Sequence, residues 1–244
     1  MTNYLITGAN SFLGKAIIKY LSSDTNNKLL IVTRSKIDFS EYSENKNIYY
    51  QSGIDLLDAK CLQILTDKCS SFFEGKLNTI NCVGYYKGQE PFEKTTISEA
   101  KKIFDSNFVC VYNTANAIIP YLIKNGGGHF ICFSCKSVKY RYPLMAPFSA
   151  SKAALDCLVG SLANEYSKIG LVANSFSLST LDTDFERTVK PFGDFDNWLK
   201  LKEVAVIIEN VVTSGFDIMN GNTIDLFKYS ESFFKKSYFD RIKK

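Results

Sequence analysis

Short apolar runs alternate with helix-like patterns along most of this chain. Apolar runs that are bounded by Gly, Asn or Asp are typical of strands buried on both faces of a sheet. Such runs predict strands at 4–8, 29–34, 48–55, 77–84, 128–134, 171–177 and 222–227. Helical spacing of the apolar residues between them predicts helices near 13–21, 58–69, 97–124, 148–168 and 203–213.

The order of these elements predicts the fold class. Strands that alternate with helices pair in parallel through right-handed crossovers. We therefore expect an α/β protein whose 1–227 region is a single-domain, Rossmann-type doubly wound parallel sheet with helices on both faces. A length of 244 residues suits one such domain, followed by a separate tail at 228–244. Pro120 lacks an amide hydrogen and is expected to bend or end the long helix before it.

Composition narrows the functional classes. No apolar run approaches the roughly 18 residues of a membrane span, so no transmembrane segment is expected. The start of the chain, MTNYLITGAN, lacks the basic and apolar regions of a secretory signal. The 7 cysteines and the single His129 lack metal-ligand spacing, so no metal site is expected. Together these features favour a reducing, cytoplasmic location.

The basic charge of the chain is concentrated in its tail. Residues 228–244 hold six basic and two acidic side chains, which accounts for the whole net charge of +4. The neutral body argues against a nucleic-acid partner. Phe234, Tyr238 and Ile242 have helical spacing within the tail. The tail could cover the pocket or dock on a neighbouring subunit, contact an anionic membrane surface, or be a frayed end.

A glycine-containing loop follows the first predicted strand. The segment TGANSFLG connects this strand to a helix, at the place where doubly wound folds bind pyrophosphate. Two glycines alone are also consistent with a tight turn that holds no ligand. The candidates for cofactor binding in this loop are Thr7, Gly8, Asn10, Ser11, Phe12, Leu13 and Gly14.

The end of the second strand bears on the choice of nicotinamide cofactor. An acid there would hold a ribose hydroxyl, whereas an arginine accommodates a 2′-phosphate. This chain has Arg34 and Ser35 at that place and no acid. The planar guanidinium of Arg34 suits a phosphate, so NADP(H) is favoured over NAD(H). The alternative is that Arg34 is a solvated loop charge.

These segments together resemble the short-chain dehydrogenase/reductase family over about 1–227. Asp55 resembles the acid that holds the adenine ring in that family. The segment NCVG resembles the family's NNAG element, with Asn81 and Gly84 retained. Lys152 matches the lysine of the YxxxK motif, and Thr183 matches a threonine of the VNxxxPGxxxT segment. The resemblance implies that all five residues contact the cofactor.

The catalytic part of the motif departs from the family. The tyrosine that donates the proton is replaced by Phe148, and the serine that holds the substrate carbonyl is replaced by Cys135. Asn107 matches the family's proton-relay asparagine, which together with Lys152 is retained. Phe148 has no hydroxyl, and Cys135 offers only a weak S–H donor. Losing a general acid costs about 10²–10⁴-fold in rate.

Several hydroxyl groups could replace the missing acid. Ser134 and Ser137 flank Cys135. Tyr85 and Tyr86 follow Gly84, and Tyr140 and Tyr142 lie in the loop that walls the pocket in the family. The favoured alternative for each tyrosine is an amphipathic residue at the pocket rim.

Two functional hypotheses follow. The first is an NAD(P)-dependent oxidoreductase that acts on a small carbonyl or alcohol with a non-standard proton donor. The alternative is a catalytically impaired, cofactor-binding pseudoenzyme that serves as a partner subunit or sensor. Epimerisation or dehydration of an activated sugar is a third, weaker reading. The resemblance also implies a homodimer or homotetramer, and the apolar stripe at 154, 155, 158, 159 and 162 fits either that interface or burial within the chain.

Overall fold

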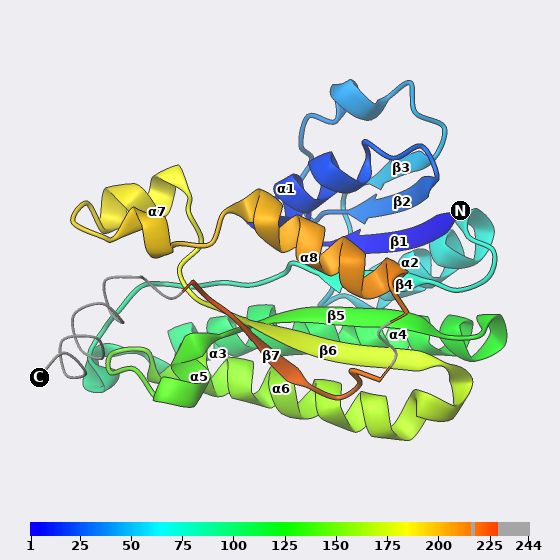
Figure 1. Ribbon diagram of the computed structural model, residues 1–244. Helices are drawn as coiled ribbons and strands as arrows, with labels where there is room; N and C mark the ends of the chain where they lie inside the picture. Colours follow the sequence, from blue (N-terminus) through cyan, green and yellow to red (C-terminus); the bar gives the residue numbers. More distant parts are fainter. Residues whose placement is uncertain (216–217, 229–244) are drawn as a thin grey trace, which may run out of the picture.

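The computed structural model describes residues 1–215 and 218–228. The hypotheses about the tail therefore concern residues that lie, apart from Lys228, outside the described part of the chain. One parallel sheet has the strand order β3-β2-β1-β4-β5-β6-β7 (Figure 1). Its strands are β1 Thr2–Thr7, β2 Asn27–Val32, β3 Ile48–Gln51, β4 Asn78–Asn81, β5 Gly128–Cys135, β6 Leu171–Leu178 and β7 Thr223–Leu226. Each strand that the apolar runs predicted is present, and the predicted fold class is confirmed.

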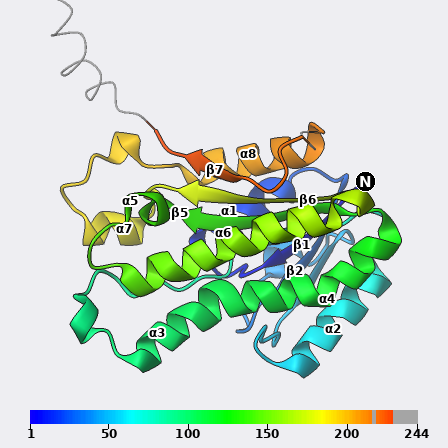
Figure 2. The ribbon, with the colours of Figure 1, turned by 90° about the horizontal axis from the view of Figure 1, so that it is seen from below.

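The helices form a layer on each face of the sheet. They are α1 Phe12–Leu21, α2 Ala59–Phe72, α3 Ile97–Phe104, α4 Cys110–Asn125, α5 Lys136–Tyr140, α6 Ala146–Tyr166, α7 Asp184–Val189 and α8 Leu201–Thr213. Helices α1 and α8 cover one face, and α2, α4 and α6 cover the other (Figures 1 and 2). Alternate residues of β1 supply the two cores, because Tyr4 and Ile6 pack beneath α1 and α8 whereas Leu5 faces α2 and α4.

The strand order places a switch point next to β1. This strand pairs with β2 on one side and with β4 on the other, so the crossovers leave it in opposite directions. In open α/β sheets, ligands bind beyond the carboxyl ends of the strands at such a point. Helices α5 and α7 also lie beyond that end of the sheet (Figure 1).

The long helix predicted at 97–124 is interrupted, but not where the sequence suggested. A π-helical turn at Asp105–Val109 separates α3 from α4. Of the two expected outcomes at Pro120, a bend or an end, the end is wrong, because helix α4 continues past Pro120 to Asn125. Packing holds the helix on both sides of Pro120, because Ile118 and Leu122 are buried in the core and the Thr66 hydroxyl donates to the Ala117 carbonyl at 3.0 Å.

Most of the apolar stripe of α6 is buried within the chain. Leu155, Val159 and Leu162 are buried in the core beneath the sheet. Their burial needs no second subunit, so the homodimer or homotetramer stays a prediction from the family resemblance. Within the described ranges, no helix is both long enough and apolar enough to span a membrane.

Candidate active site

A cavity of about 630 Å³ opens beyond the carboxyl ends of the strands. It extends from the glycine loop, across the ends of β4 and β5, to α6 and α7. Thirteen of the residues that the sequence singled out line it, namely Ser11, Phe12, Leu13, Gly84, Tyr85, Tyr86, Asn107, Ser134, Cys135, Tyr142, Phe148, Lys152 and Thr183. The remaining candidates do not line it, namely Thr7, Gly8, Asn10, Gly14, Arg34, Ser35, Asp55, Asn81, Ser137 and Tyr140.

The glycine loop has the shape of a phosphate cradle. Gly8 has a φ of +66°, and a Cβ there would lie 2.4 Å from the Val83 amide nitrogen, so only glycine fits. The Ser11 hydroxyl caps α1 by accepting a hydrogen bond from the Gly14 amide at 3.0 Å. The first turn of α1 thus begins at the cavity, where its amides and partial positive charge suit a pyrophosphate.

Thr7 and Asn81 hold the strands together below this loop. The Thr7 hydroxyl donates to the Asn81 side-chain oxygen at 3.2 Å, and the Asn81 amide donates to the Ile131 carbonyl at 3.1 Å. Both side chains are buried. They join β1, β4 and β5 and shape the cavity from beneath.

Arg34 and Ser35 lie outside the cavity, in the exposed turn after β2. The Tyr50 hydroxyl fixes this turn, because it accepts from the Ile37 amide at 2.9 Å and pairs with the Thr33 hydroxyl at 3.1 Å. Burial raises the pKa of the Cys110 thiol to about 11, and Asp55 and Arg34 act on that pKa in opposite directions. Arg34 and Asp55 therefore lie near the same buried thiol, on the side of the sheet where β2 and β3 end.

Lys152 is buried at the centre of the cavity wall. Its ammonium donates to the Phe133 carbonyl at 2.7 Å and lies 5.9 Å from the centroid of the Phe148 ring, one turn earlier on α6. Burial lowers the pKa of Lys152, and the nearby thiols of Cys132 and Cys135 offset part of that effect. The lysine side chain is therefore desolvated and held in place beside Phe148.

Asn107 occupies the π-helical turn and is fully buried. Its side-chain oxygen accepts from the Tyr85 amide at 2.8 Å, and its side-chain amide donates to the Tyr85 carbonyl at 3.1 Å and to the Ser151 hydroxyl at 3.0 Å. A π-turn inside a helix is frequent at functional sites. A Cβ on Gly84 would approach the Asn107 oxygen to 3.1 Å, so the end of β4 packs closely on this side chain.

Comparison with known proteins identifies the family. A sequence model described as short chain dehydrogenase matches residues 2–192. This chain belongs to the short-chain dehydrogenase family. A dihydropteridine reductase from Dictyostelium discoideum is 27% identical over 208 residues, covering 83% of this chain and 84% of that protein.

Solved structures of other proteins share the fold of this family member. A short-chain type dehydrogenase/reductase from Mycobacterium ulcerans has a TM-score of 0.82 at 15% identity, covering 99% of this chain and 97% of that one. ElxO with NADP bound has a TM-score of 0.80 at 18% identity, covering 92% and 96%. A tyrosine-to-phenylalanine variant of ElxO with NADPH bound has a TM-score of 0.78 at the same identity and coverage.

The two serines that flank Cys135 are already engaged in hydrogen bonds. The Ser134 hydroxyl donates to the Asp156 carboxylate at 2.8 Å, and the Ser137 hydroxyl accepts from Ser149 at 2.9 Å. Cys135 itself caps the short helix α5, because its sulfur accepts from the Ser137 amide at 3.5 Å. Neither serine hydroxyl is therefore directed at a substrate.

Asp156 is a buried acid that the sequence reasoning missed. It accepts hydrogen bonds from the hydroxyls of Ser134 and Ser175, at 2.8 and 2.6 Å. Burial raises its pKa, while these hydrogen bonds and Lys152 act in the opposite direction. The signal was its position four residues after Lys152, on the same face of α6.

The four candidate tyrosines point in different directions. Tyr85 donates to the Glu99 carboxylate at 2.9 Å, so its hydroxyl is directed to α3. Tyr140 is 49% exposed and does not line the cavity. Tyr142 lines it and stacks on Tyr140 with ring centroids 6.0 Å apart. Tyr86 lines it and meets Phe148 edge-on, with ring centroids 4.9 Å apart.

Helix α7 closes one side of the cavity and was also missed. Thr183 caps this helix by accepting from the Glu186 amide at 3.1 Å, so its hydroxyl is committed to the fold. The spacing of a threonine and a glutamate three residues later was the available signal.

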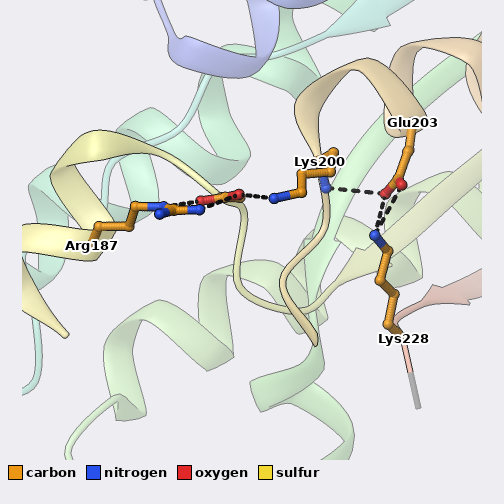
Figure 3. Close-up of polar contacts among 5 residues, drawn as sticks. Arg187, Lys200, Glu203 and Lys228 are labelled. Carbon is orange, nitrogen blue, oxygen red and sulfur yellow. Dashed lines mark hydrogen bonds and ion pairs between the residues drawn. The ribbon is translucent and has the colours of Figure 1, made fainter. Parts of the chain in front are cut away.

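Ion pairs hold α7 against the start of α8 (Figure 3). Asp182 accepts from the Arg187 guanidinium at 2.6 and 3.0 Å and also pairs with Lys200. Hydrogen bonds from these two cations hold the pKa of Asp182 well below its usual range. Glu203, one turn into α8, pairs in turn with Lys228 at 2.8 Å.

Proposed function

We propose that this protein is an NADP(H)-dependent oxidoreductase that interconverts a small carbonyl compound and the corresponding alcohol. The observation that carries the proposal is the single cavity that joins the glycine loop to Lys152 and Asn107. A nicotinamide cofactor supplies or accepts the hydride when it is bound. The chain supplies a phosphate cradle at Ser11–Leu13 and a buried cation at Lys152 to hold its pyrophosphate and ribose.

The preference for NADP(H) rests on the turn after β2. Arg34 is exposed there, with Ser35 beside it and no acid at the strand end. A planar guanidinium binds a 2′-phosphate through paired hydrogen bonds. ElxO, whose fold this chain shares, binds NADP.

The phenylalanine at position 148 is compatible with this proposal. A tyrosine-to-phenylalanine variant of ElxO holds NADPH, so one lost tyrosine hydroxyl does not prevent cofactor binding in that protein. Here the Phe148 ring keeps its place beside Lys152. The proposed reaction therefore needs a proton donor other than residue 148. No observation specifically favours the alternative of a protein that binds a cofactor without catalysis.

Trp198 provides a direct test of cofactor binding. It is the only tryptophan of the chain and it lines the cavity, so its fluorescence should change when a dinucleotide binds. We expect NADPH to bind more tightly than NADH. We expect Arg34→Ala to weaken NADPH binding about 10-fold or more, because a charge-assisted hydrogen bond contributes about 1.5–3 kcal/mol. NADH binding should not change.

Lys36→Ala is the matched control, because Lys36 is an exposed cation two residues further along the chain. Equal or tighter binding of NADH would overturn the NADP preference. No binding of either cofactor at millimolar concentration would overturn the proposed function. Binding of NADPH without reduction of any carbonyl, tested with 4-nitrobenzaldehyde, methylglyoxal and sulfoacetaldehyde, would support the non-catalytic alternative.

A further inference from the structure

Carbonyl reduction in this cavity requires an acid that residue 148 cannot provide. An efficient general acid has a pKa near the working pH, which favours a phenol over an aliphatic alcohol. Three tyrosines line the cavity, namely Tyr85, Tyr86 and Tyr142. Tyr85 is excluded because its hydroxyl already donates to Glu99 and its ring lies beneath the Lys102 ammonium at 4.2 Å.

Tyr86 is the tyrosine that touches Phe148. The two rings meet edge-on at 4.9 Å between centroids and 61° between planes. The Phe148 ring in turn lies 5.9 Å from the Lys152 ammonium. Tyr142 instead stacks on the exposed Tyr140. The hydroxyl of Tyr86 is therefore carried by a ring that is packed onto the residue in the family's acid position.

Asn107 fixes the backbone directly before Tyr86. It binds both the amide and the carbonyl of Tyr85, the preceding residue, and Tyr85 is further held by Glu99. With the Tyr85 side chain directed to α3, the next side chain along the chain is left to face α6 and the cavity. Asn107 also binds Ser151, the residue before Lys152. One buried amide thus positions Tyr86 relative to Lys152.

We propose that Tyr86 donates the proton to the substrate oxygen in place of the missing residue-148 hydroxyl. This inference rests on the proposed function, which supplies the reductant. Hydride adds its electron pair to the carbonyl carbon, and the C=O π pair moves to the oxygen. That oxygen takes the proton from the Tyr86 O–H group. The phenolate left behind recovers a proton from water at the open side of the cavity, since Tyr86 is 36% exposed.

The surroundings of Tyr86 keep its phenol protonated. Burial raises its pKa, and Glu186 of α7 and Cys135 at the end of β5 act in the same direction. The phenol therefore stays protonated at neutral pH and is a neutral acid before the reaction. Within the part of the chain that the structure describes, its hydroxyl makes no hydrogen bond, so it is free to meet a substrate oxygen.

The test is Tyr86→Phe, which removes one oxygen and leaves the contact with Phe148. With the carbonyl that the wild type reduces fastest among 4-nitrobenzaldehyde, methylglyoxal and sulfoacetaldehyde, we expect kcat to fall about 10²–10⁴-fold. The Kd for NADPH should be unchanged. Tyr140→Phe, outside the cavity, is the control and should keep wild-type kcat. Adding Phe148→Tyr to Tyr86→Phe should restore activity.

The pH dependence gives a second readout. Reduction by the wild type should decline in alkaline solution above the ordinary tyrosine pKa of about 10, because the acid is then lost. In the cofactor-free protein, ultraviolet titration should show one fewer late-titrating tyrosine in Tyr86→Phe than in the wild type.

Each outcome decides between the inference and the proposed function. A kcat of Tyr86→Phe within threefold of the wild type would overturn the inference and leave the proposed function intact. So would a large loss in Tyr142→Phe alone, or a loss of NADPH binding in Tyr86→Phe. If the wild type binds NADPH and reduces no carbonyl, the proposed function fails and the inference with it. Loss of kcat with normal NADPH binding and rescue by Phe148→Tyr would establish Tyr86 as the donor.

Discussion

The glycine loop is one continuous segment, residues 7–14, whereas the wall around Phe148 draws on separate parts of the chain. Tyr86 follows β4, Cys135 ends β5, Phe148 begins α6 and Glu186 lies on α7. The wall residues therefore belong to four separate segments. The loop is constrained as one segment, because Gly8 leaves no room for a Cβ against Val83.

This difference teaches how a fold can keep its cofactor and change its proton chemistry. Cofactor binding depends on backbone shape, which only a few residue types permit. Proton transfer depends on one hydroxyl at the right point, which any of several neighbouring segments can supply. The site thus has a cofactor-binding half around the glycine loop and a proton-handling half around Phe148. Lys152 and Asn107 connect these two halves, so changes at these residues test whether the halves are separable.

Lys152→Met should have the largest effect. It removes the buried ammonium beside Phe148 and keeps a side chain of similar shape. We expect turnover to fall about 10²–10⁴-fold and NADPH binding to weaken about 10-fold or more, because a charged hydrogen-bond donor is lost from both halves. Turnover assays and Trp198 fluorescence measure the two effects. Unchanged NADPH binding would assign Lys152 to the proton-handling half alone.

The same variant should not unfold the protein. Burial lowers the pKa of Lys152, so the folded state holds its ammonium at a cost that methionine avoids. Losing the hydrogen bond to the Phe133 carbonyl destabilises the variant, whereas losing the buried ammonium stabilises it. Because the two effects oppose each other, the free energy of unfolding should change by less than about 1.5 kcal/mol. As pH rises toward the unfolded lysine pKa of about 10.4, the folded wild type binds fewer protons than the unfolded chain. The wild type should therefore gain stability relative to Lys152→Met over that range, in urea unfolding.

Asn107→Ala should have an intermediate effect, concentrated on the proton-handling half. It leaves the amide and the carbonyl of Tyr85 without their partner, which should lower the free energy of unfolding by about 2–4 kcal/mol. Asn113→Ala is the control, because Asn113 lies on α4 and its side chain makes one hydrogen bond, to the Leu56 carbonyl. This variant should lower the free energy of unfolding by about 1 kcal/mol. We expect kcat to fall more than NADPH affinity. Equal losses in both would contradict the separation of the two halves.

The sequence predicted the elements whose signals are local. The strands followed from apolar runs, and the glycine loop followed from a strand, two glycines and a helix in order. The continuation of α4 past Pro120 did not follow from the sequence, because it depends on the packing of Ile118 and Leu122 in the core, and the interruption lies at Asn107 instead. Helix α7 was within reach, because Thr183 and Glu186 have the spacing of a capping pair.

The replacement acid could not be chosen from the sequence. Tyr85 and Tyr86 are adjacent and chemically identical, and only their contacts distinguish them. Glu99 takes the hydroxyl of Tyr85, and Phe148 receives the ring of Tyr86. Both partners lie far along the chain on helices whose orientation no local pattern reveals. The engagement of Ser134 by Asp156 was hidden in the same way.

Asp182→Asn should have the smallest effect, because it acts only on the position of α7. The carboxylate holds Arg187 and Lys200 together at the edge of the cavity (Figure 3). Exposed ion pairs contribute little to stability, so we expect a change in Tm of a few degrees at most and a rise in KM with kcat nearly unchanged. High salt should reduce the difference between the variant and the wild type.

The pH dependence of this ion pair separates it from the Lys152 effect. The folded pKa of Asp182 is lowered, so its contribution is present above the unfolded aspartate pKa of about 3.9 and is lost as pH falls through the folded pKa. The wild type and Asp182→Asn should therefore converge in Tm at the acid end, whereas the wild type and Lys152→Met diverge at the alkaline end. A large fall in kcat for Asp182→Asn would mean that α7, through Glu186, takes part in proton transfer and belongs with Tyr86.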